Sequence, residues 1–167
     1  MKAILLAAGK GTRLRPLTSD TPKCLVPIKG KPLLSFWLER LQNAGVEEFL
    51  INTHYLSEKV EDFLSSREEK ILISFEKDLL GTAGTLFSNI DFYQKSHGIF
   101  MHADNYCETD LNLFIKSHEE RPPECLLTMM VFRTKNPQSC GIVETERGVV
   151  TSFHEKKPNP PGNLANG

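Results

Sequence analysis

The feature that most constrains the fold of this chain is a short apolar run followed directly by a loop rich in glycine and cations. The run Ala3–Ala7 has the character of a buried strand. The loop after it contains Gly9, Gly11, Thr12 and Arg13. Glycines let backbone N–H groups approach oxygen anions closely, and arginine adds a planar fork of donors. The segment therefore predicts a phosphate-binding loop at the end of the first strand.

Two common phosphate-binding motifs are excluded by the spacing. A Walker loop requires Gly-x-x-x-x-Gly-Lys-Ser/Thr, and the interval from Gly9 to Thr12 is too short for it. A dinucleotide fingerprint requires glycine at its third position, where this chain has Leu14. The loop is therefore of a different phosphate-binding type.

The charge distribution favours a small polyanion as the ligand. The whole chain has a net charge of -1, which argues against a broad nucleic-acid surface. Residues 1–31, however, carry seven cationic side chains and one acidic side chain, a difference of +6. We expect Arg13 and Lys23 to contact the ligand, and Lys29 and Lys31 to be solvated.

A longer motif points to a family. Residues 11–18 read Gly-Thr-Arg-Leu-Arg-Pro-Leu-Thr, and residues 22–25 read Pro-Lys-Cys-Leu. This pattern resembles that of the sugar-1-phosphate nucleotidyltransferases, the pyrophosphorylases that make nucleotide-sugars. The resemblance is greatest to mannose-1-phosphate or heptose-1-phosphate guanylyltransferases. It implies nucleotide contacts from both glycine-containing segments, at Leu6, Ala8, Gly9, Gly11, Thr12, Arg13, Glu76, Gly81 and Thr82.

Apolar and polar segments alternate along the chain as in an α/β protein. Further strands are expected over 49–51, 71–75, 98–102 and 126–132, and helices over 33–44 and 82–89. Pro32 fits a first helical position, and Ser57 and Asp110 fit helix caps. The alternation predicts a mostly parallel, Rossmann-like sheet with helices on both faces. A β-hairpin insertion is expected over 141–153, followed by a proline-rich loop over 156–163.

Asp104 is the candidate metal ligand. It follows the strand predicted over 98–102, so it lies at the same sheet edge as the glycine loop. Mg²⁺ binds one or two carboxylates together with substrate phosphates. The resemblance likewise implies that Asp104 holds Mg²⁺. It also implies that Arg13 stabilises the leaving pyrophosphate and that Lys23 neutralises the α-phosphate and the incoming phosphate, which makes these three the catalytic residues.

Glu76 is the candidate for base selection. In the family, the segment Glu76-x-x-x-Leu-Gly81-Thr82-Ala-Gly lines the nucleobase pocket. An ionised carboxylate only accepts hydrogen bonds, and guanine offers two adjacent N–H donors. A bidentate contact from Glu76 would therefore favour GTP, whereas a glutamine at this position would suit dTTP or UTP.

The sugar side of the site is implied by the second part of the resemblance. The family has a glycine at the start of the hairpin, a Glu-Lys pair at its end and an asparagine soon after. Here Gly141, Glu155, Lys156 and Asn166 stand at these positions. Glu155 would accept sugar hydroxyls, and Lys156 would hold the sugar phosphate. Because neighbouring residues of a strand face opposite sides, the strand must end or bend between these two residues.

The function implied is transfer of a nucleotidyl group, GMP from GTP, to a sugar-1-phosphate, with release of pyrophosphate. Two alternatives stay open. One is a dTTP- or UTP-dependent transferase, and the other is a non-catalytic nucleotide-binding regulatory subunit of the same fold. The partners expected are a nucleoside triphosphate and a sugar-1-phosphate, with no nucleic acid and no membrane, and the sequence leaves a homo-oligomer open.

Length and cysteine content complete the expectations. Residues 1–167 are expected to form one nucleotidyltransferase domain, or its N-terminal portion. Family members continue past this point with elements that include a second metal aspartate, so C-terminal elements are expected to be missing. Four widely spaced cysteines give neither a zinc site nor a disulfide framework. Reduced thiols suit a cytoplasmic protein.

Overall fold

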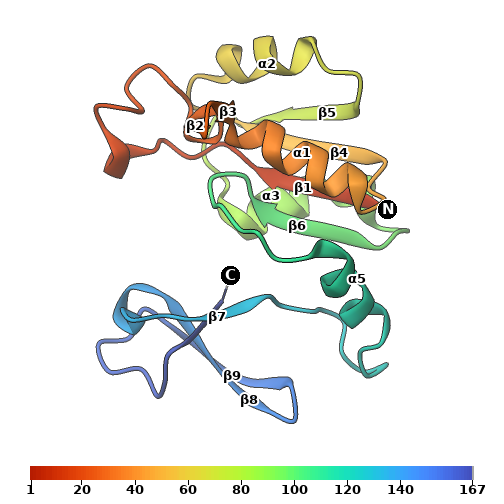
Figure 1. Ribbon diagram of the computed structural model, residues 1–167, viewed down its shortest axis with the longest axis vertical. Helices are drawn as coiled ribbons and strands as arrows, with labels where there is room; N and C mark the ends of the chain where they lie inside the picture. The colour runs from red at the N-terminus through yellow and green to blue at the C-terminus, as the bar shows by residue number, and fades with distance from the viewer. Residues whose placement is uncertain (167) are drawn as a thin grey trace. The chain divides into compact units, whose positions relative to one another are not determined.

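The structure is a computed structural model that describes residues 1–166. The chain folds into two compact units, Met1–Glu108 and a second unit that begins at Thr109. In Figure 1 the first unit runs from red to green and the second continues to blue. We call them the N-terminal unit and the C-terminal unit. The expectation of a single domain stays a prediction.

The N-terminal unit is built on a parallel sheet of four strands, in the order β5-β4-β1-β6. The strands are β1 (Lys2–Leu6), β4 (Glu48–Thr53), β5 (Lys70–Phe75) and β6 (Gly98–His102). All three pairings are parallel. The predicted α/β fold with a mostly parallel sheet is therefore confirmed.

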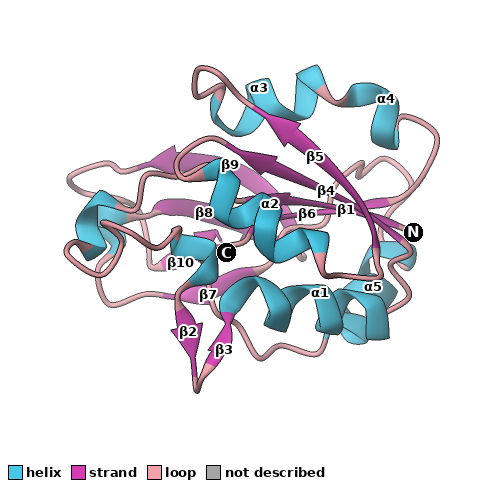
Figure 2. Ribbon diagram, turned by 90° about the horizontal axis from the view of Figure 1, so that it is seen from above, coloured by secondary structure: helices cyan, strands magenta, loops and turns pink. Residues whose placement is uncertain are grey.

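Helices cover both faces of this sheet. Helices α1 (Leu33–Asn43) and α2 (Ser57–Ser65) lie on one face, and α3 (Gly81–Ser88) and α4 (Ile90–Tyr93) lie on the other, as Figure 2 shows. The central strands β1 and β4 are buried along almost their whole length because they are covered from both sides, and each contains an apolar run, Ala3–Leu6 in β1 and Phe49–Ile51 in β4. The core is formed by fully buried side chains from β1, α1 and β4, namely Leu5, Leu34, Leu38, Leu41, Phe49, Leu50 and Ile51.

Short elements connect β1 to α1. Single turns of 3₁₀ helix span Thr12–Leu14 and Lys23–Leu25, and a small hairpin pairs β2 (Pro27–Ile28) with β3 (Lys31–Pro32). Pro32 precedes α1 instead of forming its first residue.

The predicted cap of α2 is wrong. The capping position is occupied by Leu56 in a left-handed conformation, φ 52°, and no side chain accepts a hydrogen bond there. Ser57 is the first residue of the helix. Leucine rarely adopts the left-handed conformation, so nothing in the sequence indicates that Leu56 would occupy the capping position. The neighbouring serine is a residue type that commonly caps helices, and the sequence therefore predicts the cap there.

Over residues 109–166, the C-terminal unit contains one α-helix and an antiparallel sheet. Helix α5 (Leu111–Glu119) begins after Asp110, whose Oδ1 accepts a hydrogen bond from the Asn112 N–H at 2.8 Å, as predicted for this cap. The sheet has the order β7-β10-β8-β9, with β7 (Val131–Arg133), β8 (Gly141–Glu146), β9 (Val149–Glu155) and β10 (Leu164–Asn166). A 3₁₀ turn, Pro137–Ser139, precedes β8. Strands β8 and β9 form the predicted hairpin.

The predicted strand over 126–132 is wrong in extent and in direction. Only Val131–Arg133 is a strand, and it pairs antiparallel with β10. Leu126 and Leu127 are 82% and 83% exposed. Strand structure requires a hydrogen-bonding neighbour. Within the described residues, β10 is the hydrogen-bonding neighbour of Val131 and Phe132 alone among residues 126–132.

Candidate functional site

Lys23, on the 3₁₀ turn that follows the glycine loop in the chain, meets Asp104 at the carboxyl edge of the parallel sheet. The Lys23 ammonium group lies 2.6 Å from Asp104 Oδ2. A backbone hydrogen bond joins the ends of the two strands nearby: the Ala103 N–H, directly before Asp104, donates to the carbonyl oxygen of Leu6 at 2.9 Å. Both side chains are partly open to solvent, at 23% and 27% exposure. The structure thus brings together the loop cation and the strand-end carboxylate that the sequence predicted to share an edge.

The turn of the loop depends on Gly11. This residue has φ +61°, a conformation that L side chains rarely adopt. Its carbonyl oxygen accepts hydrogen bonds from the Leu14 N–H at 2.9 Å and from Thr18 Oγ1 at 2.7 Å. A Cβ added at Gly11 would lie 3.1 Å from the Cβ of Thr18, and Thr18 is fully buried. The loop is therefore closed on itself by one glycine and one threonine.

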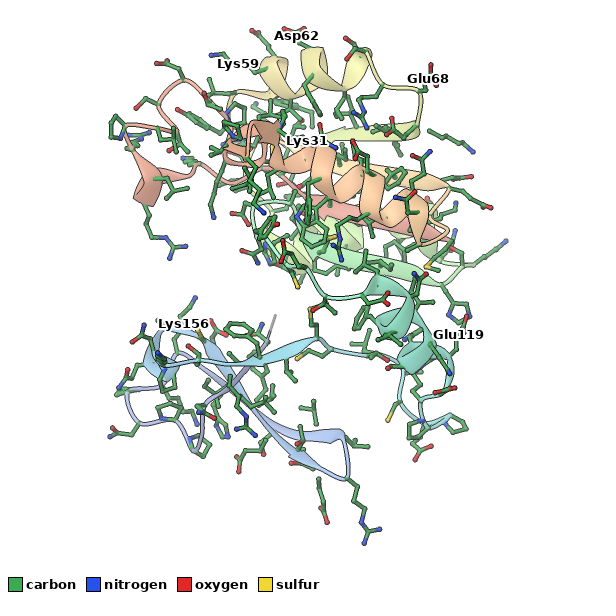
Figure 3. All side chains as sticks on the ribbon, in the orientation of Figure 1. Lys31, Lys59, Asp62, Glu68, Glu119 and Lys156 are labelled. Carbon is green, nitrogen blue, oxygen red and sulfur yellow. The ribbon has the colours of Figure 1, made fainter. Side chains whose placement is uncertain are left out.

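The return arm of the loop is held by the segment after β4. The Tyr55 hydroxyl lies 2.8 Å from the Ser19 carbonyl oxygen and 3.2 Å from that of Thr18. Lys59, which Figure 3 labels on α2, donates to the Asp20 carbonyl oxygen. These contacts fix the base of the loop and leave its tip free to receive a ligand.

The tip itself is open. Leu6 and Ala8 are buried or half-buried at the exit of β1, whereas Gly9, Thr12 and Arg13 are exposed. Exposed backbone next to exposed guanidinium and ammonium groups is the arrangement that binds phosphate oxygens. The predicted contacts themselves stay predictions.

The donor set around Asp104 fits a magnesium ion that is shared with phosphates. No cluster of three or more His, Cys, Asp or Glu side chains able to hold a metal occurs among residues 1–166. Asp104 is instead a single half-buried carboxylate beside a cationic loop. Mg²⁺ keeps water and phosphate ligands and needs only one or two carboxylates from a protein. Asp104 would hold it in that way.

The Asp104 segment is anchored from α1. Trp37 is 2% exposed, and its Nε1–H donates to the Asn105 carbonyl oxygen at 2.7 Å. The indole packs edge-on against Phe36, with ring centroids 5.1 Å apart. The hydrogen bond from the buried Trp37 to Asn105 therefore helps to hold the adjacent Asp104 in position.

Glu76 has a different environment from the one that base selection requires. Its side chain is only 4% exposed. Oε1 accepts from Asn52 Nδ2 at 2.8 Å and from Thr85 Oγ1, and Oε2 accepts from the Leu80 N–H at 3.1 Å. A carboxylate offers about four lone-pair sites, and three of them are taken within the protein. In this arrangement Glu76 can accept one further hydrogen bond, so it does not offer the two free acceptors of a bidentate contact.

The protonation state of Glu76 follows from these contacts. Burial by itself raises the pKa of a carboxyl group. Hydrogen bonds from Asn52, Thr85 and the Leu80 N–H, together with the charge of His54, outweigh burial and hold the pKa of Glu76 below its ordinary value of 4.5. Glu76 is thus a buried anion at neutral pH.

The second glycine segment follows Glu76 directly. Gly81 begins α3 with φ +68°, and both Gly81 and Thr82 are exposed. Gly84 packs tightly one turn later, because a Cβ there would lie 2.8 Å from Leu80 Cβ. The first residues of the segment, Gly81 and Thr82, are therefore exposed, and the next turn of the helix packs tightly against Leu80.

In the C-terminal unit, the side chains of two predicted sugar-side residues, Glu155 and Asn166, meet at a third, Gly141. A Cβ added at Gly141 would lie 2.7 Å from Asn166 Oδ1 and 2.9 Å from Glu155 Oε2. Lys156 has φ +44°, which ends β9 immediately after Glu155. This is the strand break that the Glu-Lys pair requires. The Lys156 ammonium group lies 3.0 Å from Glu155 Oε1.

Sequence reasoning missed Asn52 and Thr85. Asn52 ends the buried apolar run Phe49–Ile51, and it is 3% exposed. A polar residue at the carboxyl end of a buried strand was an available signal, because buried polar groups need partners. Thr85, 1% exposed, carried no comparable signal within an apolar helix.

The chain belongs to the Nucleotidyl transferase family, whose model matches residues 2–167. It is 34% identical to mannose-1-phosphate guanyltransferase beta-A of Xenopus laevis, over 93% of this chain and 45% of the relative. It is 31% identical to UTP--glucose-1-phosphate uridylyltransferase of Synechocystis sp., over 93% of this chain and 44% of the relative. The chain thus spans about half the length of the curated relatives it matches.

Solved structures show the same fold. A Bacillus anthracis protein crystallised with sucrose superposes with a TM-score of 0.89 at 22% identity, over 99% of this chain and 68% of that chain. HddC from Yersinia pseudotuberculosis, in complex with GMP-PN, superposes with a TM-score of 0.72 at 25% identity, over 99% of this chain and 72% of that chain. Over residues 1–166, no helix has both the length and the apolar character needed to cross a bilayer.

Proposed function

We propose that this chain carries the nucleotide-binding and catalytic part of a sugar-1-phosphate nucleotidyltransferase, with GTP as the nucleotide. The observation that carries the proposal is the 2.6 Å contact between Lys23 and Asp104, two groups that follow the neighbouring parallel strands β1 and β6. It places a cation and a carboxylate at the carboxyl edge of a parallel sheet, where phosphates bind in such folds. The relatives named as mannose-1-phosphate guanyltransferases support GTP and mannose-1-phosphate as the substrates.

The reaction needs no covalent enzyme intermediate. An oxygen of the sugar phosphate attacks the α-phosphorus of the nucleotide, a new P–O bond forms, and the bond to the β-phosphate breaks as pyrophosphate leaves with its electron pair. Catalysis then depends on positioning and on charge neutralisation. Arg13 stabilises the leaving pyrophosphate, and Lys23 neutralises the α-phosphate and the incoming phosphate.

Magnesium would supply further neutralisation of the nucleotide phosphates, and Asp104 would hold it. Lys23 holds the Asp104 carboxylate in place through their ion pair. In the C-terminal unit, Glu155 would accept sugar hydroxyls with Asn166 beside it, and Lys156 would hold the sugar phosphate.

A dTTP- or UTP-dependent reaction is the second candidate. It is favoured by the hydrogen bonds that already occupy Glu76, and by the 31% identity to a uridylyltransferase. The Glu76 contacts remove the strongest argument from the sequence for guanine. The relatives matched include several guanyltransferases, and these keep GTP as the first choice.

The experiment is a pyrophosphate-release assay with mannose-1-phosphate and Mg²⁺, run with GTP, UTP, dTTP and ATP in turn. The proposal expects turnover with GTP at the highest kcat/KM. A higher kcat/KM for UTP or dTTP would favour the second candidate. Nucleotide binding without turnover, measured by calorimetry on the same sample, would favour either the non-catalytic subunit or a catalytic site that needs the longer chain of the relatives.

A further inference from the structure

A buried polar cluster links the two glycine segments of the N-terminal unit. Asn52 Oδ1 accepts from the Ala7 N–H at 2.7 Å, at the exit of β1. The other end of the same amide, Nδ2, donates to Glu76 Oε1 at 2.8 Å and lies 3.2 Å from Thr85 Oγ1. We call Asn52, Glu76 and Thr85 the hub, and each of them is at most 4% exposed.

The chemistry of the hub allows only one arrangement of donors and acceptors. Asparagine has one acceptor end and one donor end. The acceptor end faces the Ala7 N–H, and the donor end faces a carboxylate. Thr85 has a single hydroxyl proton, and both Glu76 Oε1 and the Gly81 carbonyl oxygen lie within its reach. The charged acceptor is the stronger one, so the proton points to Glu76.

The hub touches each glycine segment through the backbone. Ala7 stands two residues before the exposed Gly9, and Leu80, whose N–H is bound by Glu76 Oε2, stands directly before the exposed Gly81. Moving the first segment away from the hub would break a buried hydrogen bond, and moving the second would break a part-buried one to a buried carboxylate. Leaving a buried donor without a partner is costly, so the two segments are held at a fixed separation.

We propose that Asn52 and Glu76 are positioning residues, which hold the phosphate-binding loop and the base-binding segment in register so that one nucleotide contacts both. The inference rests on the proposed function. It assigns Glu76 a role that is independent of which base is bound, and it leaves base recognition to other atoms of the segment around Gly81 and Thr82.

Glu76→Gln separates this role from direct base reading. Glutamine has the same shape, but one of its two ends is a donor, so it must present an N–H either to the Leu80 N–H or to the Asn52 amide nitrogen. Binding of GTP, UTP and dTTP, each with Mg²⁺, is measured by calorimetry. We expect about tenfold weaker binding of every nucleotide, the cost of one unsatisfied buried donor, with the ratios between nucleotides unchanged. A loss confined to GTP, or a gain for UTP or dTTP, would overturn the proposal.

Two further variants keep the test sharp. Thr85→Ser keeps the hydroxyl and should bind all three nucleotides nearly as the unsubstituted chain does. Thr85→Val removes the hydroxyl and should weaken all three together. Glu68→Gln is the matched control, because Glu68 is an exposed glutamate in the turn between α2 and β5, labelled in Figure 3. It should leave all affinities unchanged.

Backbone hydrogen exchange without any nucleotide tests the coupling itself. Glu76→Gln should raise exchange in residues 7–18 as well as in residues 80–85, because the hub connects both. Faster exchange in residues 80–85 alone would refute the coupling. If the unsubstituted chain binds no nucleotide, the proposed function fails, and the exchange experiment still decides whether the hub links the two segments.

Discussion

The Lys23 ammonium group and the Asp104 carboxylate are separated by 81 residues of sequence and by 2.6 Å in space. The contact exists because β1 and β6 are neighbours in a parallel sheet, which brings their carboxyl ends to one edge. A cation that follows β1 in the chain and an anion that follows β6 therefore lie close together. Each is held by its own anchor, Lys23 by a 3₁₀ turn and Asp104 by the neighbouring Asn105–Trp37 hydrogen bond.

Lys23→Ala and Asp104→Asn should each abolish most catalysis without unfolding the chain. Removing one group that stabilises transition-state charge costs on the order of 10²-fold or more in kcat. The ion pair is partly exposed, so its loss should lower the free energy of unfolding by less than about 1 kcal/mol. Pyrophosphate release and thermal unfolding measure the two effects.

Lys31→Ala is the control for that pair of variants. Lys31 lies in the same cationic stretch of sequence, is exposed, and pairs with Glu39 on α1. Its replacement should change neither rate nor melting temperature appreciably. Equal losses in Lys31→Ala and Lys23→Ala would mean that general charge, and not the Lys23–Asp104 geometry, supports activity.

Gly141→Ala should damage the sugar side of the site. The added Cβ would lie 2.5 Å from Phe153 Cζ and within 3 Å of oxygens of both Glu155 and Asn166. All three atoms are the ends of side chains, and Phe153 and Glu155 are exposed, so these side chains should move aside at little cost in stability while losing their places around Gly141. We expect the KM for sugar-1-phosphate to rise more than the KM for the nucleotide, as measured by varying each substrate in turn. Gly162→Ala, where the Cβ meets nothing within 4 Å, should behave like the unsubstituted chain.

The low pKa of Glu76 predicts loss of stability in acid. Its folded-state pKa is depressed, so its stabilising contribution is fully present above the unfolded value of about 4.5 and is lost as the pH falls below it. Urea unfolding between pH 7 and pH 3 should show this decline. Glu76→Gln should be less stable at pH 7 but should lose less on acidification. A parallel decline in both proteins would assign the acid sensitivity to other carboxyl groups.

The sequence predicted the parts of the site that follow from strand order and missed those that follow from register. Because the carboxyl ends of parallel strands share an edge, Asp104 could be assigned to the glycine loop without coordinates. The Asn52–Glu76 contact needs more information, since it depends on β4 pairing with β5 so that Asn52 lies opposite Ser74. Apolar patterning identifies both strands but leaves their alignment open.

The error at residues 126–132 has a related cause. The run has the composition of a strand, but composition does not say which neighbour it pairs with. Its last residues pair with β10, which comes after a proline-rich loop and is only three residues long. Such a short partner strand leaves little trace in the sequence.

Cys24 should be unreactive although it stands next to Lys23. Burial raises the pKa of its thiol to about 12, and the residue is 1% exposed. At pH 8 only about 10⁻⁴ of such a thiol is ionised, and the thiolate is the nucleophile. Titration of the folded chain with a disulfide reagent should modify Cys107, Cys125 and Cys140, which are half-buried, and should spare Cys24 until denaturant is added. Rapid labelling of all four thiols under native conditions would contradict this.

The single tryptophan should report on ligand binding beside Asp104. Trp37 is the one tryptophan of the sequence, and its indole N–H is bonded to the Asn105 carbonyl oxygen. Its burial predicts blue-shifted emission in the folded chain. Because Asn105 follows Asp104 directly, nucleotide with Mg²⁺ should change the intensity of that emission, and Asp104→Asn should abolish the magnesium-dependent part. Trp37→Phe should lower the free energy of unfolding by about 1–3 kcal/mol, since it removes packing from a fully buried position together with a part-buried hydrogen bond. A magnesium response that persists in Asp104→Asn would place the metal at another group.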